Sequence, residues 1–306
     1  MDIYLPIAEL PVNVFVLLGL GFAAGFLSGM FGIGGGFLLT PILIFIGVPP
    51  AVAVGSGANQ LVVTSLTGLF GHFRRGNVDF KMGGVMMVGG LVGSFLGIAL
   101  FRLLSAIGQL DLVISLSFVA FLLAVGALMG IESVRTILRQ RRGAAPRRKA
   151  HQHTFVHGLP FKLRFRKSKL YVSAFAPITI GFMTGLFASV MGIGAGFIMI
   201  PAMIYLLGMA TSVVVGTSLL QIALVASVAT VLHAATAQTV DILLVVMLSA
   251  GAVFGAELGV RTGLKLRADF LRALLAAIVL VVAGRLIFAL TTAPTHIYSI
   301  ASVGSP

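Results

Sequence analysis

The chain has 306 residues, of which 58% are hydrophobic and only 9% are charged, and its mean hydropathy is +1.12. Soluble globular proteins carry about 25% charged residues, so this composition excludes a soluble enzyme, a nucleic-acid-binding protein and a disordered chain. Apolar runs of membrane-spanning length recur along the sequence. We therefore expect an all-α polytopic membrane protein.

Ten apolar segments are predicted, five in each half of the chain. The second and the seventh are too short to cross a bilayer as straight helices, which takes about 20 residues, so we expect broken or re-entrant helices there. The ten segments cover about residues 12–31, 36–48, 52–71, 82–102, 112–131, 173–191, 196–208, 212–233, 241–264 and 271–291.

The net charge of +13 is concentrated in one hydrophilic stretch, because 12 of the 21 Lys and Arg residues lie between Glu132 and Tyr171. Positive charge marks the cytoplasmic loops of membrane proteins. We therefore expect residues 132–172 to form a cytoplasmic loop and both termini to lie outside, in the inner (cell) membrane of a bacterium. Alternating side chains at 162–166 and 170–173 predict a short β-hairpin within this loop.

The sequence repeats itself at an offset of about 160 residues. The segment Gly25–Pro41 matches Gly185–Pro201 at seven of 17 positions. Each half has an odd number of segments, so the second half enters the membrane from the opposite side, as in many secondary transporters. The predicted fold consists of two inverted-topology repeats, at 1–131 and 173–306, joined by the basic loop.

Glycines also recur at every fourth residue in four of the segments. Such ridges let helix backbones approach closely, and sliding along them during transport is the other hypothesis. The ridges are Gly21, Gly25 and Gly29; Gly181 and Gly185 with Ser189; Gly89, Gly93 and Gly97; and Gly251, Gly255, Gly259 and Gly263.

A glycine turn interrupts the apolar pattern at the same place in each half. Glycine permits a positive φ and leaves backbone N–H groups accessible, and the helix that follows presents a partially positive N-terminus. Exposed N–H groups at a helix start bind anions, whereas a plain turn between helices would need no ligand. The predicted anion site is formed by Gly32, Gly34, Gly35, Gly36, Gly192, Gly194, Ala195 and Gly196.

Amide side chains lie inside the third and eighth segments. Asn59 and Gln60 occupy one, and Gln221 occupies the other. Buried amides are costly unless paired, so these residues either contribute donors to an anion or hydrogen-bond between helices. We place Gln60 and Gln221 beside the converging glycine turns, and Asn59 with them.

Three ionisable residues, Glu257, Arg261 and Arg285, are set deepest in the predicted segments. Glu257 and Arg261 are spaced to pair along one helix face, and we expect them to do so inside the protein. A structural ion pair and a coupling or substrate relay are both consistent with charges at this depth.

The duplicated turn resembles a known signature. Gly32-Ile-Gly-Gly-Gly-Phe37 and Gly192-Ile-Gly-Ala-Gly-Phe197 are followed by Pro41 and Pro201. With Val54-Gly55-Ser56, Val215-Gly216-Thr217-Ser218 and Leu159-Pro-Phe, they resemble the TauE/SafE sulfite exporter family over about residues 12–290. Ala195 stands where the first half has Gly35, and Leu220 aligns with Asn59, so we expect an asymmetric site.

The resemblance implies transport of sulfite, sulfoacetate, other sulfonates or related small sulfur anions. We expect an exporter working by alternating access; a passive anion channel and an importer are the alternatives. No nucleophile–base pair or metal-ligand cluster is evident, and the chain has no Cys, so we expect no enzyme, metal or cofactor. The expected partners are the anion and membrane lipid, not nucleic acid, and a homo-oligomer is left open.

Overall fold

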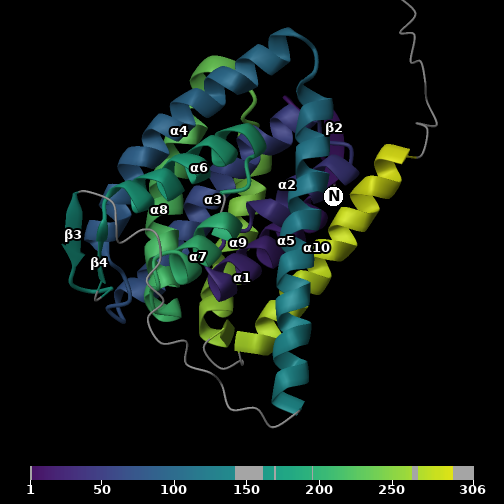
Figure 1. Ribbon diagram of the computed structural model, residues 1–306. Coiled ribbons are helices and arrows are strands. Elements are labelled where there is room, and N and C mark those ends of the chain that lie inside the picture. The colour runs from purple at the N-terminus through teal and green to yellow at the C-terminus, as the bar shows by residue number, and fades with distance from the viewer. Residues whose placement is uncertain (1, 142–160, 169, 195, 264–267, 292–306) are drawn as a thin grey trace, which may run out of the picture.

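The computed structural model describes residues 2–141, 161–168, 170–194, 196–263 and 268–291. Ten α-helices occupy this part of the chain, one for each predicted segment (Figure 1). The helices are α1 (Val14–Phe31), α2 (Gly36–Phe45), α3 (Pro50–Phe73), α4 (Phe80–Ala106), α5 (Leu110–Arg141), α6 (Phe175–Met191), α7 (Gly196–Tyr205), α8 (Thr211–Leu232), α9 (Ile242–Gly263) and α10 (Ala268–Thr291). A short π-helix (His233–Ala237) extends α8.

Two antiparallel hairpins accompany the helices. The strands β3 (Lys162–Phe165) and β4 (Leu170–Ser173) form the hairpin that the alternating pattern predicts. A second hairpin, formed by β1 (Asp2–Leu5) and β2 (Leu10–Asn13), was not predicted. The β3–β4 hairpin and β2 lie on opposite sides of the helix bundle (Figure 1).

Five helices are long and apolar enough to cross a membrane, judged by length and composition within the described residues. These stretches are Val14–Phe31, Phe80–Ala106, Leu110–Ala127, Thr211–Ala237 and Ile242–Gly263. The helices α2 and α7 have ten residues each, about 15 Å at 1.5 Å per residue. That is half of a hydrocarbon core about 30 Å thick.

Helix α5 is longer than expected. It continues to Arg141, ten residues past the boundary that its apolar run predicted at 131. Residues 142–160 of the basic stretch lie outside the described residues. The start of this stretch is therefore helical rather than an irregular loop.

The glycine ridges bring helix backbones into direct contact, as predicted. A methyl group at Gly25 would overlap the backbone of Ala252 in α9, and one at Gly255 would overlap that of Phe22 in α1. The same relation joins α6 and α4, where a methyl group at Gly185 would meet the carbonyl of Gly90. The helices therefore form two tightly packed pairs, α1–α9 and α4–α6. These pairs lie beside the two central helices, with α9 against α3 and α4 against α8.

The two central helices, α3 and α8, run in opposite directions. Helix α3 begins in an apolar cluster with the β1–β2 hairpin and ends where Lys167, beside β3, donates to the carbonyl of Gly76. Helix α8 begins in a cluster with Phe165 and Val172 of the β3–β4 hairpin. Each hairpin thus lies at one end of the central helix pair.

The interior of the bundle is mainly apolar but also contains polar side chains, and much of its surface is apolar. Large apolar side chains such as Phe15, Phe95 and Phe254 are exposed. An apolar exterior that keeps polar side chains inside is the arrangement expected of a protein surrounded by lipid. The buried polar side chains of the helices include Ser28, Thr40, Ser56, Gln60, Thr64, Ser65, Ser94, Thr184, Ser189, Thr217, Ser218 and Gln221.

Candidate functional site

The two glycine turns end α1 and α6 in the left-handed conformation. Gly32 has a φ of 72° and Gly192 a φ of 67°, and each N–H closes the last turn of the helix before it. Gly34 and Gly194 follow with φ of 73° and 70°. Residues with a side chain rarely adopt these angles, which explains the glycine at these four positions.

The structure brings the two turns together, backbone to backbone. A methyl group at Gly36 would lie 2.5 Å from the carbonyl oxygen of Gly192, and one at Gly196 would overlap the backbone of Ile33. Gly35 packs equally closely on the carbonyl of Ala24 in α1. Ala195 lies outside the described residues.

The start of α2 is buried and has no side-chain cap. Its N-cap residue is Gly35, which has no side chain that could cap the helix, and Gly36 and Phe37 are both buried. The N–H groups of its first turn include those of Leu38 and Leu39, which donate to the carbonyl of Gly35 at 3.3 Å. They carry partial positive charge toward the meeting point of the turns.

Helices α3 and α8 present mainly apolar side chains to the turns. Leu61 and Ile222 pack against both Gly34 and Gly194. Ser218 is the polar exception, because its hydroxyl donates to the carbonyl of Gly32 at 2.9 Å.

The two glutamines lie beside this contact stripe rather than on it. On α8 the stripe runs through Val215, Ser218 and Ile222, so Gln221 is rotated away from it. Its Nε2 donates to the Thr184 hydroxyl of α6 at 2.8 Å, and Gly90 of α4 also approaches it. Gln221 therefore connects helices, while its Oε1 has no partner among the described residues.

Gln60 is fully buried, and neither polar atom of its side chain has a hydrogen-bond partner among the described residues. It directly precedes Leu61, which touches the first turn. At the offset of 160, Ala24 stands where the second half has Thr184, so the hydroxyl that pairs Gln221 has no equivalent beside Gln60. Asn59 is half-buried.

The placement of the charged residues differs from the sequence prediction. Arg261 and Glu257 form the predicted ion pair, but their side chains are 67% and 57% exposed. They lie in the last turns of α9, where they line a hollow with Arg74 and Arg75. Arg285 is also exposed. The expectation that Glu257 and Arg261 pair inside the protein is therefore wrong. An apolar run predicts how deep a residue lies along a helix but not which way its side chain points.

Because the pair is exposed, Glu257→Gln should change little. Exposed ion pairs spaced four residues apart contribute about 0.3–0.5 kcal/mol. We expect thermal unfolding in detergent to shift by no more than this energy implies, and Arg261→Gln to behave alike. A large loss of stability in either variant would contradict the exposed placement.

Two buried aspartates connect the hairpins to the helix bundle, a role that the sequence analysis missed. The carboxylate of Asp241 accepts hydrogen bonds from the N–H groups of Ile7 and Ala8 in the β1–β2 turn, at 2.9 and 3.3 Å. The carboxylate of Asp79 accepts from the N–H and hydroxyl of Ser168 in the β3–β4 turn, at 3.1 and 2.6 Å.

The backbones of these aspartates are held by the central helices. The N–H of Asp241 donates to the Ser56 hydroxyl of α3, and that of Asp79 donates to the Thr217 hydroxyl of α8, both at 3.0 Å. The repeated Val-Asp pairs at 78–79 and 240–241 were the available signal. The same offset of 160 places residues 2–13 over 162–173 and would have indicated the first hairpin.

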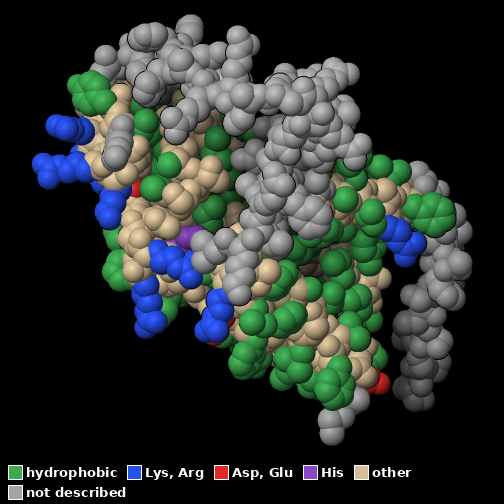
Figure 2. Space-filling view, turned by 90° about the horizontal axis from the view of Figure 1, so that it is seen from below, with side chains coloured by type: hydrophobic (Ala, Val, Ile, Leu, Met, Phe, Trp, Pro, Cys, Tyr) green, Lys and Arg blue, Asp and Glu red, His purple; other side chains and the backbone are tan. Residues whose placement is uncertain are grey.

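Positive charge gathers on one part of the molecule. Figure 2 shows Lys and Arg side chains mainly along one side of the face seen from below, next to a broad hydrophobic surface, with a further basic group at the opposite edge. This charge asymmetry is typical of a membrane protein with a cytoplasmic face.

Comparisons with known proteins identify membrane transporters as relatives of this chain. The family model described as sulfite exporter TauE/SafE matches residues 17–286. The chain is 29% identical to the probable membrane transporter protein YjnA of Bacillus subtilis, over 90% of this chain and 100% of that protein. It is 28% identical to YunE of the same organism, also named a probable membrane transporter protein, over 89% of this chain and 97% of that protein.

A probable membrane transporter protein of Xylella fastidiosa is 29% identical, over 69% of this chain and 70% of its own length. No solved structure matches the chain. The family match covers the glycine turns, the central helices and both aspartates. The chain therefore belongs to the sulfite exporter TauE/SafE family of membrane transporters.

Proposed function

We propose that this protein exports small sulfur oxyanions, such as sulfite, sulfoacetate or other sulfonates, across the cell membrane. The observation that carries the proposal is the buried amide of Gln60, unpaired among the described residues. An unpaired buried amide costs about 1–3 kcal/mol. A ligand that accepts hydrogen bonds from it would recover that energy.

The proposed site contains the glycine turns, the start of α2 and the amides of Gln60 and Gln221, with Asn59 at its edge. Backbone N–H groups and amides attract an anion without a full positive charge. A transporter must also release its substrate, and neutral donors make release easier than a buried Arg would. The contacts of Gly34 and Gly194 with Leu61 and Ile222 mean that helices must shift for an anion to enter.

We further propose that residues 1–131 and 173–306 are inverted repeats that alternate access to this site. The opposed directions of α3 and α8 support this, and so do the matching bonds from Asp241 to Ser56 and from Asp79 to Thr217. The short helices α2 and α7 would then re-enter the membrane. The basic segment 132–172 and the β3–β4 hairpin would face the cytoplasm, with both termini outside a bacterial inner membrane.

Export is the direction that the membrane potential favours for an anion. Each negative charge that leaves a cell with a negative interior gains about 2.3 kcal/mol per 100 mV. Sulfite flux from proteoliposomes should be saturable and should rise when the vesicle interior is made negative. Flux that stays proportional to concentration would indicate a passive channel, and flux unaffected by the potential would contradict electrogenic export.

Replacing Gln60 with leucine should stabilise the protein and weaken transport. Leucine has a similar size and no buried polar atom to leave unpaired, so we expect a gain of about 1 kcal/mol in detergent. Loss of one hydrogen bond to the anion should raise the concentration for half-maximal sulfite flux about tenfold.

Gln221→Leu is the matched control, because Gln221 already donates to Thr184. This change should not stabilise the protein, since it breaks an existing hydrogen bond. If Gln60→Leu transports sulfite and sulfoacetate with unchanged apparent affinity, Gln60 is not part of the anion site.

A further inference from the structure

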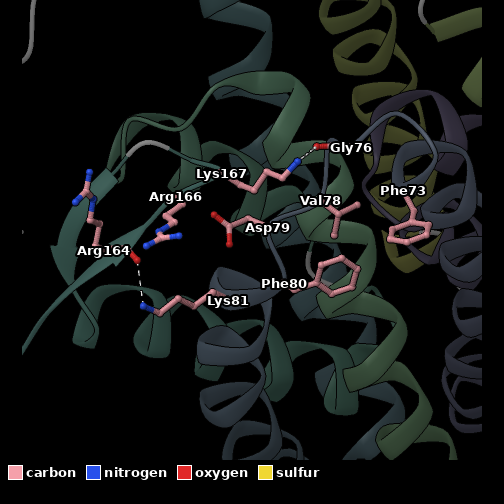
Figure 3. Close-up of a pocket in the computed structure, with 9 residues that line it drawn as sticks. All are labelled: Phe73, Gly76, Val78, Asp79, Phe80, Lys81, Arg164, Arg166 and Lys167. Atoms are coloured by element: carbon pink, nitrogen blue, oxygen red, sulfur yellow. Dashed lines mark hydrogen bonds between the residues drawn. The ribbon is translucent and has the colours of Figure 1, made fainter.

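A basic hollow opens between the β3–β4 hairpin and the loop that joins α3 to α4 (Figure 3). Its volume is about 610 Å³, and Lys81, Arg166 and Lys167 contribute cations to it. Phe73 and Phe80 form the side next to the helices. The hollow lies apart from the glycine turns and has no part in the proposed transport site.

The cations of the hollow retain free hydrogen-bond donors. Arg166 makes no hydrogen bond or ion pair with any residue that the structure describes, and Figure 3 shows its guanidinium pointing toward Asp79 and Lys81. Lys81 and Lys167 donate to the carbonyls of Arg164 and Gly76, at 3.1 and 3.2 Å. Each ammonium has three donors, so two remain on each lysine.

The single carboxylate in the hollow does not pair with these cations. Asp79 is 2% exposed, and its oxygens accept from Ser168 and from the N–H of Met82. No ion pair joins it to Lys81, Arg166 or Lys167. The hollow therefore keeps a strong positive charge together with unused donors.

The opposite side of the hollow is apolar and exposed. Phe73 and Phe80 pack edge to face with ring centroids 5.8 Å apart, and they are 53% and 56% exposed. They lie at the last residue of α3 and the first of α4, where the helix bundle meets its charged end. A ligand that fits both sides has a compact anionic group and a hydrocarbon chain.

We propose that this hollow binds the headgroup of an anionic phospholipid, with the phosphate at Arg166, Lys81 and Lys167 and the acyl chain along Phe73 and Phe80. Basic residues at the membrane surface attract anionic lipid with about 1 kcal/mol each. The shape of the site adds selectivity to that attraction. A bound lipid would fasten the hairpin to the start of α4. Asp79 connects the same two parts, because it accepts hydrogen bonds from Ser168 and from the N–H of Met82.

The test measures, by native mass spectrometry, how much dioctanoyl phosphatidylglycerol the purified full-length protein binds. Dioctanoyl phosphatidylcholine and inorganic phosphate are the comparison ligands. We expect preferential retention of phosphatidylglycerol, and Arg166→Gln should weaken it about fivefold. Arg166→Gln removes no hydrogen bond among the described residues, so the variant should fold normally, which gel filtration can verify.

Arg74→Gln is the control for general electrostatics. Arg74 lines the separate hollow beside Glu257 and Arg261 and stacks on Phe70, so its loss should leave phosphatidylglycerol binding within twofold. Equal losses in both variants would mean that charge alone attracts the lipid, and would overturn the proposal. Retention of inorganic phosphate as tight as that of the lipid would also overturn it, because the site would then recognise a soluble anion.

Discussion

Asp241→Ala should destabilise the protein by about 3 kcal/mol or more. The carboxylate accepts four hydrogen bonds, two from the β1–β2 turn and two from the first turn of α9 at Leu243 and Leu244. Hydrogen bonds to a charged group contribute about 1.5–3 kcal/mol each, and buried donors left unpaired add to the loss. Thermal unfolding in detergent and the yield of monodisperse protein measure the effect.

Asp79→Ala should behave in the same way at the other end of the bundle. The variant Asp79→Asn separates the contribution of the helix cap at Met82 from that of the negative charge that binds Ser168. Asn at position 79 still accepts from the N–H of Met82, because asparagine caps helices about as well as aspartate. Because Asp79→Asn keeps this bond, its loss of stability should be smaller than that of Asp79→Ala. It still loses the negative charge that binds Ser168, so it should be less stable than the parent.

The exposed Asp111, in the first turn of α5, is the matched control. Asp111→Ala should change stability by no more than about 0.5 kcal/mol. If Asp241→Ala is as stable as Asp111→Ala, the hairpins are not fastened to the bundle in the way described.

The helices were predictable because the signals for them are local. Apolar runs located all ten, and glycines at 32 and 192 marked the ends of α1 and α6 to the residue. The glycine ridges also predicted close helix contact, because glycine has no side chain and lets the backbone of any neighbouring helix approach closely. Helix α5 extends past its apolar run because the end of such a run marks a change of solvent and not the end of a helix.

The polar contacts were less predictable, because they depend on how each helix is rotated. Gln221 meets Thr184 from a helix 37 residues away, and the sequence does not indicate which side of α8 faces α6. Gln60, its counterpart at the offset of 161, has no described partner, although the two residues look equivalent in the sequence. The exposure of Glu257 and Arg261 has the same origin, since hydropathy does not tell an inward face from an outward one.

Gly196→Ala should abolish sulfite transport, because the added methyl group has no room. It would overlap the carbonyl oxygen, the carbonyl carbon and the Cα of Ile33 in the opposite turn. These are backbone atoms, so no change of side-chain rotamer can move them away. Overpacking of this kind costs about 1–3 kcal/mol, so the variant should reach the membrane with its two turns forced apart.

Two other glycines separate this effect from general effects of alanine. Gly84, in α4, has open space around its Cβ position, so Gly84→Ala should stabilise the helix by up to about 1 kcal/mol and leave flux unchanged. Gly108 also has open space but a φ of 70°, so Gly108→Ala tests backbone strain alone. If Gly196→Ala transports sulfite as well as these two variants do, the contact between the turns is not required for transport, and the anion site must be sought elsewhere along α3 and α8.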